Sequence, residues 1–168
     1  MGGERSLYDT DFLTWTEEQA AALRELAARR DLPNRLDLEN VIEEIETLGR
    51  SELKAATSPI RLILGHLLKA AMQPDSPARH HWAVEIAAWH GEARDEILPS
   101  MHRKIDMNDL WRRAIRDARV ALDRDGIALP RDITAACPLP LDAFLQEAFD
   151  FDAALAQVAT AVPRPALA

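Results

Sequence analysis

Residues 59–72, PIRLILGHLLKAAM, decide the fold class of this chain. Their aliphatic side chains recur at steps of three and four, which is the spacing of one helix face. Leu62 adds an apolar side chain on the other side, so we expect this helix to be the most buried one. Arg61, His66 and Lys69 interrupt the run, which makes it too short and too charged to span a bilayer.

Other segments on both sides of this helix have the same spacing and are bounded by capping residues, proline or glycine. We expect helices at about residues 11–30, 37–57, 76–98 and 107–125, with a last helix starting near 140. Pro59 is either a boundary or a kink, so the helices before and after it are separate or continuous. No segment alternates as a strand does. The prediction is an all-α fold, a five- to six-helix bundle with short, mostly antiparallel connections.

The first expected helix has an apolar face that we predict to be its core side, formed by Phe12, Trp15, Gln19, Ala22, Leu23 and Leu26. Only the two ends of the chain lack such a pattern. We therefore expect a single helical domain over 8–157, a disordered stretch at 1–7 and a flexible Pro/Ala tail at 158–168.

Composition excludes several classes of protein. The chain has 168 residues, of which 48% are hydrophobic, so it is long and apolar enough to form a core. A net charge of −8 disfavours a non-specific nucleic-acid binder. One cysteine, Cys137, excludes an internal disulfide, and its apolar neighbours indicate a packing thiol. No secretory signal or membrane span is visible, so we expect a cytoplasmic protein without a membrane partner.

Short motifs follow one another in order along residues 8–150. They are Tyr8-Asp-Thr-Asp-Phe12 with Trp15, the run Leu38 to Glu52, His66-Leu-Leu-Lys69, Gln73-Pro74, Trp82 with Ile86, Pro99-Ser100, Ala118-Arg119 and Cys137-Pro138. Together they resemble a bacterial family called domain of unknown function 29. The chain departs from that pattern at Ala70, where the family usually has Trp. The resemblance implies a bacterial, cytoplasmic, all-helical protein and no particular activity.

A divalent-metal site is one hypothesis for the ionisable side chains. Glu39 and Glu46 flank the apolar stripe of the second expected helix, where a bundle can hold a metal. His81 and Glu85 stand at i, i+4 on another helix, and His66 is the obvious further ligand. The alternative is a set of solvated ion pairs, which would require no cofactor.

A protein interface is the second hypothesis. Arg112, Arg116 and Arg119 follow one another at i, i+4 and i+7, on the side of their helix away from Trp111. They are expected to face solvent, a partner protein or, with lower preference, nucleic acid. The acidic pair Glu43 and Glu44 is the complementary candidate, in this chain or in a second copy.

No catalytic or nucleotide-binding motif of known mechanism occurs in the chain. The sequence therefore favours a non-enzymatic protein-interaction or structural module that acts as a homo-oligomer or with another protein. The alternatives are an enzyme or sensor that uses a divalent metal and, third, a nucleic-acid contact through the arginine face.

Overall fold

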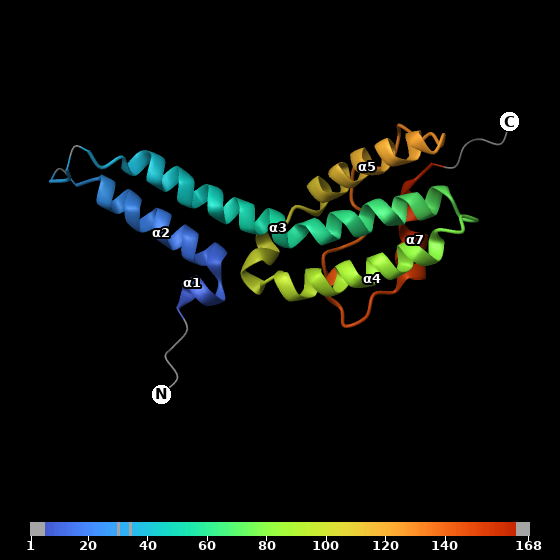
Figure 1. Cartoon of the computed structure of the whole chain (residues 1–168), viewed down its shortest axis with the longest axis horizontal. Helices are drawn as coiled ribbons and strands as arrows, with labels where there is room; N and C mark the ends of the chain where they lie inside the picture. Colours follow the sequence, from blue (N-terminus) through green and yellow to red (C-terminus); the bar gives the residue numbers. More distant parts are fainter. Residues whose placement is uncertain (1–5, 30, 34, 164–168) are drawn as a thin grey trace. The chain divides into compact units, whose positions relative to one another are not determined.

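The structure is a computed structural model that describes residues 6–29, 31–33 and 35–163. Within these residues every regular element is a helix and there is no strand, which confirms the all-α class (Figure 1). The elements are α1 (Leu7–Thr10), α2 (Phe12–Ala27), α3 (Leu38–Met72), α4 (Arg79–Glu96), the 3-10 helix η1 (Pro99–Lys104), α5 (Met107–Arg124), α6 (Asp142–Leu145) and α7 (Phe151–Ala161). None of these described helices has both the length and the apolar composition that crossing a bilayer requires.

Helix α3 runs through Pro59 without a break, so the expected second and third helices are one continuous element. Its first turn is capped by the Asp37 carboxylate, which accepts a hydrogen bond from the Asn40 backbone N–H at 3.2 Å. A proline inside a helix removes one backbone hydrogen bond and crowds the preceding turn. The burial of Ile60, Ile63 and Leu64 just after Pro59 offsets that cost.

The contacts of the chain divide into two compact units, where the sequence predicts a single domain over 8–157. Unit 1 consists of residues 1–56 and 98–105, and unit 2 of residues 57–97 and 106–168. Unit 1 therefore contains α1, α2, the first part of α3 and η1. Unit 2 contains the rest of α3 together with α4, α5, α6 and α7.

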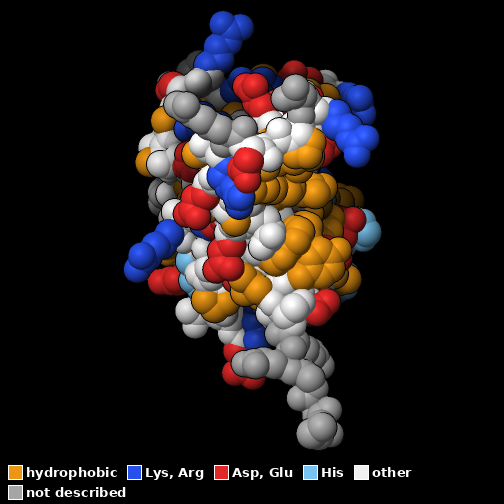
Figure 2. All heavy atoms as spheres, turned by 90° about the vertical axis from the view of Figure 1, so that its left-hand side faces the viewer, with side chains coloured by type: hydrophobic (Ala, Val, Ile, Leu, Met, Phe, Trp, Pro, Cys, Tyr) orange, Lys and Arg blue, Asp and Glu red, His pale blue; other side chains and the backbone are white. Residues whose placement is uncertain are grey.

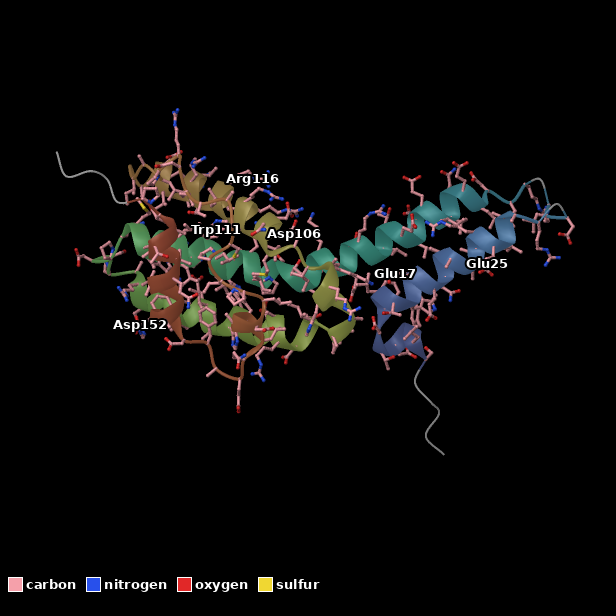
Figure 3. The ribbon with its side chains drawn as sticks, turned by 180° about the vertical axis from the view of Figure 1, so that it is seen from behind. Glu17, Glu25, Asp106, Trp111, Arg116 and Asp152 are labelled. Atoms are coloured by element: carbon pink, nitrogen blue, oxygen red, sulfur yellow. The ribbon has the colours of Figure 1, made fainter. Side chains whose placement is uncertain are left out.

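Unit 2 has an extensive apolar core. Helix α5 turns inward the side of Trp111, from which the sequence predicts that the arginines point away, with Trp111, Ala114, Ala118 and Leu122 buried. The indole N–H of Trp111 donates to the backbone oxygen of Thr134 at 2.7 Å, so its polar edge is satisfied (Figure 3). The fully buried large side chains of this unit are Ile60, Ile63, Leu64, Leu67, Leu68, Ile86, Trp111, Leu122, Leu139, Phe144 and Val158.

The C-terminal helix extends further than expected. Position 158, where the sequence predicts that a flexible tail begins, lies inside α7, and Val158 is fully buried. The small and apolar side chains of α7 form a helical stripe that continues to Ala161. At the other end of the chain, Leu7 already belongs to α1. Residues 1–5 and 164–168 lie outside the described residues.

In unit 1, α2 packs on α3 through small residues. An added Cβ at Gly49 would lie 2.3 Å from the Thr16 Oγ1, so the two helices approach each other closely there. The buried side chains of α2 are Leu13, Thr16 and Ala20. The prediction of the core face of α2 is therefore wrong, and the buried side is displaced by about one residue. Of the side chains expected to be buried, Ala22 is exposed and the others are only half-buried, namely Phe12, Trp15, Gln19, Leu23 and Leu26. The close approach through small side chains excludes the larger ones.

Candidate functional site

A cluster of ionisable and aromatic side chains lies between α3 and α4 in unit 2. We call it the His66 cluster; its members are His66, Lys69, His81, Trp82, Glu85 and Trp89. The two residues from α3 stand at i, i+3, and on α4 Glu85 lies four residues after His81, three after Trp82 and four before Trp89. Each helix therefore presents its members on one side.

One imidazole nitrogen is the centre of this cluster. The Nε2 of His66 lies 3.0 Å from Oε2 of Glu85 and 2.9 Å from Nζ of Lys69. The second carboxylate oxygen of Glu85 lies 3.4 Å from Nε2 of His81. The Nδ1 of His66 lies 3.1 Å from the backbone oxygen of Leu62. A single carboxylate thus joins two imidazoles and stands near an amine.

The hydrogen bonds determine where the protons of His66 are. A carbonyl oxygen only accepts, so Nδ1 of His66 carries a proton and donates it to Leu62. Nε2 then stands between a donor and an acceptor. A neutral imidazole accepts from Lys69 at this atom, and an imidazolium donates from it to Glu85. The same nitrogen can therefore take a proton from one partner and share it with the other.

Burial shifts the titration of both cationic partners. Loss of solvation is the largest cause that lowers the pKa of His66, and the charge of Lys69 lowers it further. Loss of solvation likewise lowers the pKa of Lys69, against the attraction of Glu85 and Asp125. The side chain of His66 is 15% exposed and that of His81 is 70% exposed, so the cluster reaches from the interior to solvent.

Two indole rings enclose the cluster. The ring of Trp89 meets His66 edge-on with centroids 4.6 Å apart, and Lys69 Nζ lies 5.4 Å from the ring centroid of Trp82. A cation over an indole face is stabilised as water is removed from it. The rings therefore hold the imidazole and the amine in place in a partly dry setting.

A pocket of about 180 Å³ opens beside the cluster, between α3 and α5. Its wall is small and apolar at Gly65, Ala118 and Ala121. The polar side chains that line it are Arg61, His66, Lys69 and Asp117. Arg61 and Asp117 form an ion pair across it.

The structure brings together three of the five metal-ligand candidates. His66, His81 and Glu85 meet in the His66 cluster, whereas Glu39 and Glu46 lie on the part of α3 that belongs to unit 1. Glu46 is paired there with Arg24, and Glu39 is exposed. In the part of the chain that the structure describes, no group of three or more His, Cys, Asp or Glu side chains is arranged to hold a metal ion.

The amine of Lys69 gives a physical reason why the His66 cluster is not arranged to hold a metal ion. Its amine lies 2.9 Å from the same nitrogen that a metal would need, and a cation there repels a second one. Sequence reasoning missed Lys69 and the two tryptophans as members of this site. The signal was present, since Lys69 is a charged residue three positions after His66 within a strongly apolar helix.

The arginine face predicted on α5 lies in unit 2. Arg112 is exposed and pairs with Asp109 at 3.1 Å, and Arg119 donates to the backbone oxygen of Pro130 at 3.1 Å. Arg116 is exposed on the outer side of α5 (Figure 3). Two of the three arginines are thus already bonded within the unit, and Arg116 is the most available to a partner.

The acidic candidates Glu43 and Glu44 are exposed on the part of α3 that belongs to unit 1. Two large apolar side chains near them are also exposed, Val41 at 40% and Leu48 at 46%. Figure 2, in which the left-hand side of Figure 1 faces the viewer, shows hydrophobic side chains gathered on one side of that face. Of the large hydrophobic side chains that are exposed among the described residues, four belong to unit 1, namely Tyr8, Leu36, Val41 and Leu48, and two to unit 2.

Cys137 is half-buried, and burial raises the pKa of its thiol. Its backbone N–H donates to Oδ1 of Asn108 at 2.8 Å. A raised pKa keeps the thiol protonated and a poor nucleophile. This setting agrees with the packing role that its sequence favours.

The comparisons with known proteins agree with the fold. The family model described as Domain of unknown function DUF29 matches residues 7–150. A crystal structure of an alpha-helical protein of unknown function from Rhodospirillum rubrum is similar to this chain, with 42% sequence identity and a TM-score of 0.72. The similarity covers 92% of this chain and 98% of that one. No curated protein matches the chain.

Proposed function

The chain belongs to the family of Domain of unknown function DUF29, and we propose that it is a protein-interaction module that binds a second copy of itself. The contact joins the outer side of α3 in unit 1 of one copy to the outer side of α5 of the other. The observation that supports it most is the pair Val41 and Leu48, two large apolar side chains left exposed on one face of a helix.

The α3 surface combines these apolar side chains with acid. Val41 and Leu48 stand at i, i+7, so they share a face, and Glu44 lies between them on that side. Glu43 is about 100° further round the helix and does not belong to the surface. A helix with such a stripe typically packs it against another helix. The negative charge of Glu44 favours a partner helix that carries a positive charge at the matching position.

The α5 surface has the complementary composition. Val120 is 57% exposed and stands four residues after Arg116, so the two lie on one face. Arg116 is an exposed cation on a helix whose neighbouring arginines already have partners. Pairing Leu48 with Val120 and Glu44 with Arg116 removes apolar surface from water and matches opposite charges.

Nucleic acid fits this α5 surface less well than protein does. Arg112 and Arg119 are already bonded to Asp109 and to the backbone oxygen of Pro130. The exposed side chain next to Arg116 is an aliphatic valine rather than an aromatic ring on which a base can stack. The chain as a whole has a net charge of −8, which opposes a polyanion.

Static light scattering over a range of concentrations tests the proposal. The wild type is expected to associate at micromolar concentration, and Leu48→Glu is expected to shift it to a monomer. Val84→Glu is the matched control, because Val84 is 56% exposed on α4, outside both surfaces. Circular dichroism of each variant establishes that the helices are retained. A wild type that stays monomeric at the highest soluble concentration contradicts the proposal.

Charge reversal tests the pairing itself. Glu44→Arg and Arg116→Glu are each expected to weaken association, and the double variant to restore it, because it exchanges the two signs. Single reversals that leave association unchanged contradict this geometry.

We also place this association in the cytoplasm of a bacterium, which is supported by the single thiol of the chain and by the Rhodospirillum rubrum relative.

A further inference from the structure

A pocket of about 290 Å³ lies in unit 1, between α2 and the first part of α3, with η1 at its edge. The small residues Thr16, Ala20 and Gly49 line it where the two helices approach each other. Its volume is near the lower end of the roughly 300–1,000 Å³ that is typical of small-molecule sites. The pocket therefore has room for a small ligand.

Part of the pocket wall is apolar. Leu13, Ala20 and Leu53 line it, and Leu13 and Ala20 are buried. The hydroxyl of Thr16 donates to the backbone oxygen of Leu13 at 2.7 Å, so this polar group already has a partner. An apolar ligand group can cover such a wall without leaving a polar group unsatisfied.

The charged side chains that line the pocket do not balance, because three are cations and two are acids. Lys104 pairs with Glu17 at 2.5 Å, so these two charges match. Glu46 pairs with Arg24 and also stands four residues before Arg50 on α3. Two guanidinium groups therefore share one carboxylate. The pocket has an excess positive charge, although the net charge of the chain is −8.

Arg50 is the cation that is available to a ligand. One nitrogen of its guanidinium donates to the neutral hydroxyl of Thr47 at 2.6 Å. Among the described residues no carboxylate forms an ion pair with Arg50, and its side chain is exposed. A guanidinium has five N–H donors and matches a carboxylate with two parallel hydrogen bonds. The ligand that fits this side chain best is a carboxylate.

The charged and the apolar parts of the pocket lie at different heights along α3. Glu46 and Leu53 are seven residues apart, which corresponds to about 10 Å along the helix axis. The side chain of Arg50 leans toward the N-terminus of its helix, and therefore toward Glu46 and away from Leu53. An extended chain of eight carbons has a length similar to this separation.

We propose that this pocket binds a medium-chain monocarboxylate. Arg50 binds the carboxylate, which supplies the negative charge that the pocket lacks. The hydrocarbon chain lies against Leu13, Ala20 and Leu53, so its apolar surface leaves water.

Isothermal titration calorimetry of the full chain with octanoate tests this proposal. Octanoate is expected to bind with a Kd below about 1 mM. Octanamide has the same chain without the charge and is expected to bind about tenfold more weakly. Acetate has the charge without the chain and is expected to give no measurable binding. Equal binding of octanoate and octanamide, or no saturable binding of octanoate, overturns the proposal.

A substitution of Arg50 tests the carboxylate contact. Arg50→Gln is expected to weaken octanoate binding about tenfold and to leave octanamide binding unchanged. Arg29→Gln is the matched control, because Arg29 is an exposed arginine of unit 1 that does not line the pocket. An equal loss in both variants shows that binding follows the net charge and overturns the role of Arg50. Circular dichroism verifies that each variant is folded.

The length of the ligand tests the size of the site. Affinity is expected to rise about threefold for each CH₂ group from butanoate to octanoate, because each group buries more apolar surface. It is expected to level off at dodecanoate, whose chain is longer than the pocket. An affinity that keeps the same rise up to dodecanoate contradicts binding in a pocket of this size.

Amide shifts in NMR spectra locate the ligand. Octanoate is expected to shift Ala20 and Gly49, which line the pocket, and to leave Gly91 on α4 unchanged. Shifts at Gly91 without shifts at Gly49 overturn this site. Glu46 lies about 160° round α3 from Leu48, so the pocket and the proposed self-association surface are on different sides of that helix. Leu48→Glu is therefore expected to leave octanoate binding unchanged.

Discussion

The two units of this protein bury very different amounts of apolar side chain. Among the fully buried large side chains of the described residues, Met101 is in unit 1 and all the others are in unit 2. In unit 2, α3 has neighbours in α4 and α5, and its Leu64, Leu67 and Leu68 are fully buried. In unit 1, α2 and α3 meet through a glycine and a threonine, and larger side chains stay half-exposed.

This difference indicates where each kind of function can reside. A well-packed unit holds ionisable groups at fixed distances, as the His66 cluster requires, because its side chains cannot move apart cheaply. A thinly packed unit retains apolar surface that a partner can cover. The His66 cluster and the proposed association therefore lie where the packing favours each.

The largest expected effect comes from removing one leucine of each unit. Leu64→Ala in unit 2 deletes a fully buried side chain and is expected to cost about 3 kcal/mol in the free energy of unfolding. Leu26→Ala in unit 1 deletes a half-buried one and is expected to cost about 1 kcal/mol. Urea unfolding measures both. Equal losses contradict the contrast in packing between the units.

Two helical glycines give a second comparison, because replacing each with alanine is expected to change the stability in opposite directions. Gly49→Ala in unit 1 places a Cβ 2.3 Å from Oγ1 of Thr16 and is expected to destabilise the protein by about 1–3 kcal/mol. Gly91→Ala in unit 2 meets nothing within 4 Å and is expected to stabilise it by about 0.5–1 kcal/mol. Urea unfolding measures the sign and size of both stability changes. A stabilising Gly49→Ala shows that the helices of unit 1 can move apart without cost.

The sequence predicts unit 2 better than unit 1, for a physical reason. In α5 the sequence places Trp111 on the side away from the arginines, and Trp111 is buried, because helix periodicity identifies a core face when other helices pack on it. In α2 the largest apolar side chains, Phe12 and Trp15, are not the most buried ones. Periodicity measures size and polarity, and it does not reveal that small residues set the contact with α3.

The candidate site was only partly predictable. The pair His81 and Glu85 follows from i, i+4 spacing on one helix, which is a local property. The contact of His66 with Glu85 depends on how α3 packs against α4, and local spacing does not give that. In the sequence, Lys69 only interrupts an apolar run. Its place in the cluster becomes visible only when Trp82 and His66 are placed beside it.

Acid is expected to weaken unit 2 first. Burial lowers the pKa of His90, so the unfolded chain takes up this proton at a higher pH than the folded one. The stability that neutral His90 provides is fully present above about pH 6.5 and is lost as the pH falls below it. Urea unfolding at neutral and mildly acidic pH measures this loss. His90→Gln is expected to reduce the pH dependence.

The matched control for this titration is His102→Gln, because His102 is exposed in unit 1. It is expected to leave the pH dependence unchanged. If His102→Gln removes the pH dependence of stability and His90→Gln does not, the titrating group lies in unit 1 and this prediction is wrong.

The smallest expected effects come from one surface ion pair in each unit. For these pairs we expect the two units to lose similar amounts of stability. Arg24 pairs with Glu46 in unit 1 and Arg61 with Asp117 in unit 2, and all four side chains are at least 31% exposed. Glu46→Gln and Asp117→Asn are each expected to change the free energy of unfolding by less than about 1 kcal/mol, since solvent screens both pairs. The loss should shrink in high salt. A large loss from Glu46→Gln alone would mean that charge, and not apolar burial, holds the helices of unit 1 together.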